Sequence, residues 1–248
     1  MISPIPLLAA LAPVALAGAV QFNGIPSVGV LYSGGDASKH FCTASVIESK
    51  FGNVILTAGH CISGTGGGLS FAPGYHDGKL PYGSYPVTGA YVHPNWNKNH
   101  DINFDFAFLT LGKGKHNGNL VNVQSVTGGN KLVTNAGYKN QVEVVGYNDG
   151  QQKATHCNIG TFEAKAGQLG FNCGPFSGGT SGSPWMSGYN SKTQHGNVIG
   201  NIGGWHTGGC NPNTSYSSKY GAGTAEVFNR ANAGSKGDNV RGGAGSGC

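Results

Sequence analysis

Three short stretches of this sequence carry side chains that together have the chemistry to cleave an acyl bond. The segment 57–61 presents His60 beside a cysteine, and Asp105 follows 45 residues later at the start of an apolar run. Ser181 lies in the glycine-rich stretch Gly178-Gly179-Thr180-Ser181-Gly182-Ser183-Pro184. A serine hydroxyl becomes a nucleophile when a histidine takes its proton and an acid orients that histidine. The sequence therefore predicts a catalytic triad of His60, Asp105 and Ser181.

Each of these residues is a weak signal when it is taken alone. The chain has nine histidines, an aspartate before an apolar run is commonly a turn residue, and serine is common in glycine-rich loops. The order His, Asp, Ser is one of three orders in which unrelated hydrolases arrange a triad. The prediction depends on this order combined with the local sequence around each residue.

With these blocks the chain resembles the chymotrypsin-like serine peptidases, and within them the secreted trypsin-like group of bacteria and fungi. The resemblance runs from about Ile25 to Phe228 and includes Phe41-Cys42-Thr43-Ala44-Ser45 and Val198-Ile199-Gly200. It implies a serine endopeptidase that hydrolyses protein or peptide substrates through an acyl-enzyme, without a metal or organic cofactor. It also implies an oxyanion hole built from the backbone N–H groups of Gly179 and Ser181. Glycine at 179 lets that peptide turn its N–H toward the oxyanion without a Cβ in the way.

Two positions in the serine segment depart from the pattern of trypsin and chymotrypsin. Thr180 stands where those enzymes have an aspartate that pairs with the amino terminus created on activation. No obvious activation peptide precedes Val20, so activation through that ion pair is not expected. Ser183 replaces a glycine, a change also met in glutamyl endopeptidases, and it does not threaten catalysis.

The residues that select the substrate are left open by the sequence. Pro175 stands where trypsin carries the aspartate that selects Lys and Arg, so trypsin-like specificity is not expected. The resemblance implies that Ile202-Gly203-Gly204-Trp205 binds the substrate backbone by strand addition. Two kinds of pocket remain: one in which His206 recognises an acidic side chain, and an apolar or small one shaped by Phe176, Gly203 and Gly204.

Composition and patterning predict an all-β fold. Among 248 residues only 10% are charged and 45 are glycine, which is typical of many short strands joined by turns. We expect two antiparallel six-stranded β-barrels with the active-site cleft between them: 20–118 carrying His60 and Asp105, and 119–230 carrying Ser181. The Gly-rich tail 231–248 is expected to be mobile.

Apolar runs separated by turn residues predict the individual elements. In the first half we expect strands at 25–32, 41–47, 53–57, 69–72, 87–92 and 106–111, followed by a linker at 112–119. In the second half we expect strands at 141–147, 155–158, 168–172, 183–186 and 197–202, and a short helix at 224–229.

Six cysteines indicate an oxidising compartment. We expect a disulfide between Cys42 and Cys61, which bracket the strand that leads to His60. We expect a second one between Cys157 and Cys173, which flank one hairpin-like segment. Elimination then pairs Cys210 with Cys248. A zinc site is the rival interpretation, but the chain has no Cys-x-x-Cys and the spaced pair His206 and Cys210 has no partner pair.

The segment 1–19 reads as a signal peptide with an apolar stretch followed by small residues, so we expect a secreted protein. That stretch is short for a membrane span, and no second one follows. The formal net charge of +5 is spread along the chain, which does not favour nucleic-acid binding. A monomer is the default for a peptidase of this size. The alternative functions are a catalytically silent homologue that acts as a binding protein, and hydrolysis of non-peptide esters.

Overall fold

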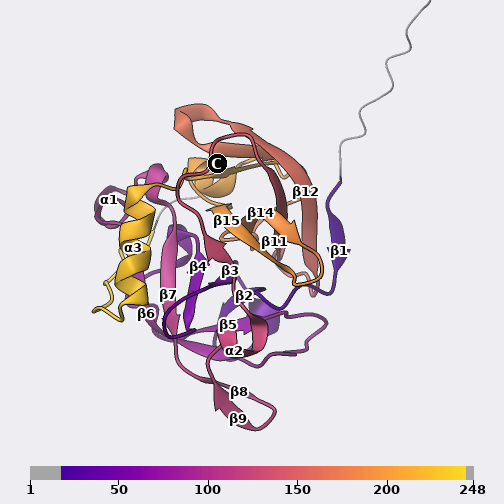
Figure 1. Ribbon diagram of the computed structural model, residues 1–248, viewed down its shortest axis with the longest axis vertical. Helices are drawn as coiled ribbons and strands as arrows, with labels where there is room; N and C mark the ends of the chain where they lie inside the picture. The colour runs from indigo at the N-terminus through magenta and orange to yellow at the C-terminus, as the bar shows by residue number, and fades with distance from the viewer. Residues whose placement is uncertain (1–17, 244–248) are drawn as a thin grey trace, which may run out of the picture.

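Six strands of the N-terminal half close into an antiparallel barrel in the computed structural model, which describes residues 18–243 (Figure 1). Around the barrel the order is β2-β3-β4-β7-β6-β5, and β5 returns to pair with β2. The six predicted strands of this half are confirmed as β2 (Val28–Ser33), β3 (Cys42–Ile47), β4 (Val54–Thr57), β5 (Leu69–Pro73), β6 (Tyr85–Val92) and β7 (Ala107–Leu111).

Strands of this barrel are buried on both faces, because each face packs against a different apolar cluster. Successive side chains of a strand point to opposite faces. In β4, Ile55 belongs to the cluster inside the barrel, whereas Val54 and Leu56 belong to a cluster that also contains Val145 and Met186 of the second half. The apolar core therefore continues from the barrel into the contact between the two halves.

The second half forms an eight-stranded sheet in the order β10-β15-β14-β11-β12-β13-β16, with β1 paired to β12. Its strands are β1 (Val20–Phe22), β10 (Lys131–Leu132), β11 (Gln141–Gly146), β12 (Ala154–Glu163), β13 (Leu169–Asn172), β14 (Pro184–Asn190), β15 (His195–Asn201) and β16 (Thr214–Ser217). The five strands predicted in this half are confirmed.

The second barrel that the sequence predicts is not closed. The end strands β10 and β16 do not pair with each other. The edge strand β10 contributes only Lys131 and Leu132, which run parallel to β15. Since a barrel needs a continuous ladder around its circumference, so short an edge strand leaves the sheet open.

Two segments do not follow the predicted division of the chain into 20–118 and 119–230. β1 directly follows the predicted signal, yet it pairs with β12 of the second sheet and not with the first barrel. The predicted linker 112–119 contains a hairpin of β8 (Gly114–His116) and β9 (Asn119–Val121). The boundary between 118 and 119 therefore falls at the turn of this hairpin. Residues 1–17 of the predicted signal peptide lie outside the described residues.

Within residues 18–243 the helices are short. They are α1 (Pro94–Asn99), α2 (Gln124–Thr127) and α3 (Ala222–Asn232), with 3₁₀ turns η1 (Ala37–Lys39), η2 (Gly59–Cys61), η3 (Ile102–Phe104), η4 (Lys165–Gly167) and η5 (Trp205–Gly208). The predicted short helix is confirmed as α3, which packs on β6 and β7. It buries Thr224, Val227 and Ala231, a spacing that gives a helix one apolar face.

The C-terminal tail is not loose over its described part. Residues 233–243 return to the first barrel, where Val92 N–H donates to the Asp238 carboxylate (2.9 Å) and Asp238 N–H donates to Ala90 O (2.7 Å). Val240 is 3% exposed and exchanges two backbone hydrogen bonds with Gly64. Because these bonds and this burial repay the ordering of the glycines, the prediction of a mobile tail is wrong for 233–243.

Two of the predicted disulfides are confirmed, Cys42–Cys61 and Cys157–Cys173. Cys210 is disulfide-bonded. Its predicted partner Cys248 lies outside the described residues, so the third pairing stays a prediction.

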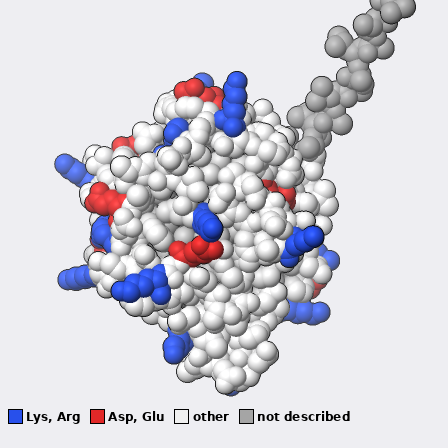
Figure 2. All heavy atoms as spheres, viewed as in Figure 1, with Lys and Arg blue, Asp and Glu red and all other residues white. Residues whose placement is uncertain are grey.

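The surface carries few charges, and they are dispersed. On the face shown in Figure 2, Lys and Arg side chains are dispersed, and some of them lie beside Asp or Glu. No helix among residues 18–243 is long and apolar enough to cross a membrane.

The packing of the tail predicts a loss of stability when Val240 is truncated. Val240→Ala should lower the free energy of unfolding by about 1.5–3 kcal/mol, because it removes fully buried apolar surface. Val20→Ala, at a valine that is 58% exposed, is the matched control and should change it by less than about 0.5 kcal/mol. Urea unfolding measures both, and equal effects would contradict a packed tail.

Candidate active site

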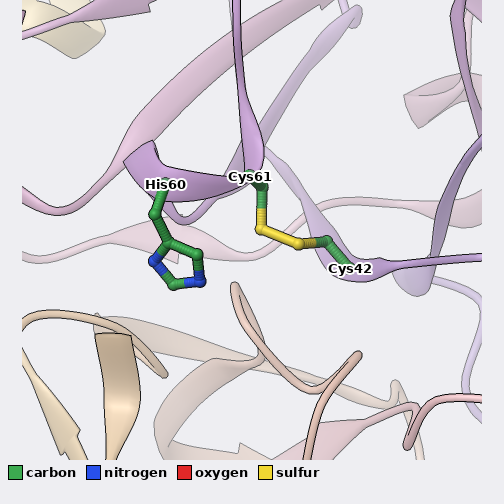
Figure 3. A group of neighbouring side chains, drawn as sticks. All are labelled: Cys42, His60 and Cys61. Carbon is green, nitrogen blue, oxygen red and sulfur yellow. A yellow bond between two sulfur atoms is a disulfide. The ribbon is translucent and has the colours of Figure 1, made fainter. Parts of the chain in front are cut away.

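His60 lies in η2, the turn that follows β4. The next residue, Cys61, is bonded to Cys42 on β3, so the turn is tied to the neighbouring strand. Figure 3 shows the imidazole and the disulfide leaving this turn in different directions. The histidine backbone is thereby held on two adjacent strands of the barrel, while its ring is left to contact other groups.

Asp105 directly follows η3 and lies two residues before β7, and its side chain is fully buried. Its Oδ1 accepts the His60 backbone N–H at 2.9 Å. Its Oδ2 lies 2.8 Å from His60 Nδ1 and accepts the Gly204 N–H at 2.7 Å. An ionised carboxylate can only accept hydrogen bonds, so Nδ1 carries the proton in this pair. The other ring nitrogen, Nε2, is then left as an acceptor.

Ser181, in the second half of the chain, supplies the hydroxyl that contacts His60 Nε2. Its Oγ lies 2.7 Å from His60 Nε2, within the reach that direct proton transfer requires. A continuous hydrogen-bonded line thus runs from the Asp105 carboxylate through the imidazole to the serine hydroxyl. The three residues predicted from the sequence are brought together where the barrel meets the second sheet.

Further residues hold Asp105, and sequence reasoning missed them. Asp105 N–H donates to Ser218 Oγ (3.1 Å), and the Asn201 amide donates to Asp105 O (3.2 Å). The Tyr220 hydroxyl in turn donates to Asn201 Oδ1 at 2.6 Å. Burial, and then the nearby charge of Asp105, raise the pKa of Tyr220 well above its usual value, so it stays a donor. These residues follow Asp105 by about a hundred positions and carry no motif.

Both predicted oxyanion donors have an N–H that is free of other partners. Gly178 O accepts Asp149 N–H at 2.6 Å, and Thr180 O accepts Ser183 N–H at 3.0 Å. Because a trans peptide sets its C=O and N–H on opposite sides, the N–H groups of Gly179 and Ser181 point away from these contacts. Neither N–H donates to any residue in the described part of the chain.

Glycine is required at two positions of the serine segment. Gly179 and Gly182 both have φ of +86°, a conformation that side chains with a Cβ rarely adopt. A Cβ on Gly179 would lie 2.6 Å from Asp149 N, and one on Gly182 would lie 2.2 Å from Thr43 O. The steric conflict is thus with neighbouring backbone and not, as the sequence suggested, with the oxyanion itself.

The two unusual residues of the segment form bonds within it. The hydroxyl of Thr180 donates to Ser177 O at 2.6 Å, and Thr180 is 2% exposed. The hydroxyl of Ser183 donates to Thr180 O at 2.6 Å. Neutral hydrogen bonds therefore replace the ion pair that an aspartate at 180 would form.

A cavity of about 350 Å³ opens beside Ser181. Of the predicted substrate-binding residues, Phe176 and Ile202 line it, whereas Pro175, Gly203, Gly204 and His206 do not. None of its lining residues is charged. Five others that line it carry hydroxyls and were missed as pocket residues, because they come from separate segments of the chain: Ser177, Thr180, Thr207, Thr214 and Ser215.

The predicted residues outside the cavity have other contacts. Gly204 N–H donates to Asp105, and Gly203 N–H donates to Tyr216 O at 3.0 Å. The ring of His206 packs against Trp205, with centroids 4.6 Å apart. Pro175 O accepts the Asn148 amide at 3.4 Å.

One group of potential metal ligands lies near the site, formed among the described residues by Cys42, His60 and Cys61 (Figure 3). The two sulfur atoms are bonded to each other, and a metal requires thiolates. Both ring nitrogens of His60 already face Asp105 and Ser181. These donors therefore do not fit a metal ion.

Parts of this chain are similar in sequence to known proteins. A family model described as Trypsin matches residues 19–213. An extracellular metalloprotease of Bacillus subtilis (strain 168) is 30% identical over 79 residues, which make up 30% of this chain and 24% of that protein. The chain thus matches about a quarter of the length of this curated relative.

Solved structures of low identity share the fold. Protease Anisep from Arthrobacter nicotinovorans has a TM-score of 0.70 at 23% identity, covering 86% of this chain and 98% of its own. A Glu endopeptidase in complex with MPD has a TM-score of 0.68 at 20% identity, covering 88% of this chain and 98% of its own. At such identities the likeness concerns the fold alone.

The match to the family model is decisive for classification. It spans well over half of the chain and includes the segments of His60, Asp105 and Ser181. On this ground the chain belongs to the trypsin family of serine proteases, which are hydrolases.

Proposed function

We propose that this protein is a secreted endopeptidase in which Ser181 is the nucleophile, His60 the general base and acid, and Asp105 the group that orients His60. The observation that carries the proposal is the line of contacts from Asp105 Oδ2 to His60 Nδ1 (2.8 Å) and from His60 Nε2 to Ser181 Oγ (2.7 Å). Protein and peptide substrates follow from the family.

In this proposal Ser181 Oγ attacks the carbonyl carbon of the scissile peptide bond, and His60 Nε2 takes the hydroxyl proton. The imidazolium is stabilised by Asp105, while the N–H groups of Gly179 and Ser181 donate to the developing oxyanion. His60 then gives the proton to the leaving amine, and the C–N bond breaks. A water molecule repeats the sequence on the acyl-enzyme, which releases the acid and restores Ser181.

The cavity beside Ser181 is proposed to hold the side chain that precedes the scissile bond. Several of its hydroxyl protons are already donated to the protein: Ser177 Oγ to Asn148 Oδ1 (2.9 Å), Thr180 Oγ1 to Ser177 O and Thr214 Oγ1 to Asn172 Oδ1 (3.0 Å). These oxygens remain as acceptors, which suit neutral or hydrogen-bond-donating side chains. A carboxylate would lose hydration and would meet no positively charged group among the lining residues. Between the two pockets left open by the sequence, this favours the uncharged one over recognition by His206.

The finer features of the fold and location are also proposals. We propose that the open second sheet corresponds to the second barrel of a double-barrel protease, with the substrate bound between the halves. Two disulfides favour an oxidising compartment, and a relative bears the name extracellular. We therefore propose that the protein acts outside the cell, as a monomer.

Removal of the nucleophile should abolish turnover without disturbing the fold. Ser181→Ala is expected to lower kcat by about 10⁶, because it removes the attacking oxygen of an intact triad. Mass spectrometry of a diverse peptide library, digested by wild type and by the variant, measures it. Cleavage by both would refute the triad. Silence of well-folded wild type would favour a binding protein.

Asp105→Asn tests the orienting role. The amide can present an N–H to Nδ1 and so reverse the tautomer of His60, and kcat should fall by about 10⁴. Asp101→Asn is the matched control, since Asp101 caps η3 through Asn103 N–H and an amide oxygen also accepts that bond. Steady-state kinetics give kcat for both variants. A comparable loss of kcat in Asp101→Asn would count against the orienting role of Asp105.

The pocket predicts the preference at the scissile bond. Cleavage in the same library should follow neutral side chains far more often than Asp or Glu, because no described lining residue supplies a positive charge. His206→Ala should leave this profile unchanged. Dominant cleavage after Glu, lost in His206→Ala, would reverse the assignment.

A further inference from the structure

The peptide carbonyls from Gly178 to Ser181 are all hydrogen-bonded, so every peptide plane of the serine segment is held. Three of the five bonds come from the second half of the chain: Asp149 N–H donates to Gly178 O (2.6 Å), and the N–H (3.0 Å) and hydroxyl (2.6 Å) of Ser183 both donate to Thr180 O. The other two come from Thr43 in the first barrel, whose hydroxyl donates to Gly179 O (3.0 Å) and whose N–H donates to Ser181 O (2.8 Å).

The Thr43 hydroxyl makes a second contact that joins another segment to this one. While it donates to Gly179 O, it accepts the Tyr147 N–H at 2.9 Å. Tyr147 leads directly to Asn148, whose side chain accepts the Ser177 N–H (2.8 Å), and to Asp149. The hydroxyl of Thr43, which is fully buried, thus connects β3 to two segments, 147–149 and 177–181, which surround the oxyanion donors.

No ion pair supports these segments among the described residues. The hydroxyl of Thr180 is used on Ser177 O, so it makes no tie to the first barrel. Gly179 has no side chain to restrict its rotation. The Gly179–Thr180 peptide is held on both sides: its N–H donates to Ser177 O (3.2 Å) within the serine segment, and its carbonyl accepts the Thr43 hydroxyl from across the junction.

We propose that the Thr43 hydroxyl is a positioning group for the oxyanion hole, which keeps the N–H groups of Gly179 and Ser181 aimed at the substrate carbonyl. This rests on the proposed peptidase function. Without the hydroxyl, Gly179 O and Tyr147 N–H would be buried without partners, at about 1–3 kcal/mol each. The Gly179–Thr180 peptide would then tilt to recover a bond for Gly179 O. This tilt would shift the N–H groups of Gly179 and Ser181, which belong to the peptides on either side of it.

Thr43→Val, which keeps the shape and removes the hydroxyl, tests this against Thr43→Ser, which keeps the hydroxyl. With the concentration of active sites fixed by titration, Thr43→Val should lower kcat about 10- to 100-fold and leave KM nearly unchanged. Its affinity for a peptide aldehyde, whose adduct with Ser181 presents an oxyanion, should fall by a similar factor. Thr43→Ser should stay close to wild type.

Thr57→Val is the matched control for a purely structural effect. Thr57 is fully buried, and its hydroxyl donates to Thr43 O at 2.8 Å without contacting the carbonyls of 178–181. It should lower the Tm but leave kcat per active site unchanged. If Thr43→Val fails to fold, Thr43→Ala replaces it in the same comparison.

Two outcomes would overturn the proposal: an unchanged kcat per active site in the hydroxyl-free variant, or the same kcat loss in Thr57→Val. Failure of the underlying function is distinguishable, because Ser181→Ala would then retain wild-type activity or wild type would have none. The proposal is supported if kcat falls only in the Thr43 variants without the hydroxyl, and if their affinity for the peptide aldehyde falls by a similar factor.

Discussion

The buried carboxylate of Asp105 is the constraint on which the site depends. A charge removed from water must be compensated by hydrogen bonds, and here three N–H donors approach it. Two belong to His60 on the first barrel and one to Gly204 on the second half. Satisfying this one carboxylate therefore requires the halves to meet in one arrangement, and that arrangement also brings Ser181 to the second nitrogen of His60.

The contact between the halves is held by an apolar core and by neutral hydrogen bonds around the serine segment. Strands buried on both faces supply the core, because alternate side chains of β2, β4 and β7 pack inside the barrel and against the second half. Thr43 and Gly182 lie so close that a Cβ on the glycine would collide with Thr43 O. Such close approach leaves little freedom for the backbone that carries the N–H donors, which is what preorganised stabilisation of an oxyanion requires.

The sequence predicted local features well and long-range ones unevenly. The eleven predicted strands, the helix α3 and two disulfides were found because each depends on periodicity or spacing within a short window, whereas β8, β9, β10 and β16, each of two to four residues, were not predicted. The packed tail and the place of β1 were missed, since pairing of β1 with β12 and of Val240 with Gly64 joins residues far apart in the chain. The second barrel was expected to close, but the two-residue β10 leaves its edge open.

By itself, the sequence determined the chemistry available to this protein: a serine, a histidine and an aspartate in recognisable local settings, with glycines where the backbone needs φ near +86°. Only the tertiary structure decided which groups support them. Asn201 and Ser218 lie in no motif, and although Thr43 and Thr180 lie in recognisable segments, nothing in those segments shows which groups their hydroxyls contact. Their roles arise from distance and direction, which exist only once the barrel and the second sheet have packed together.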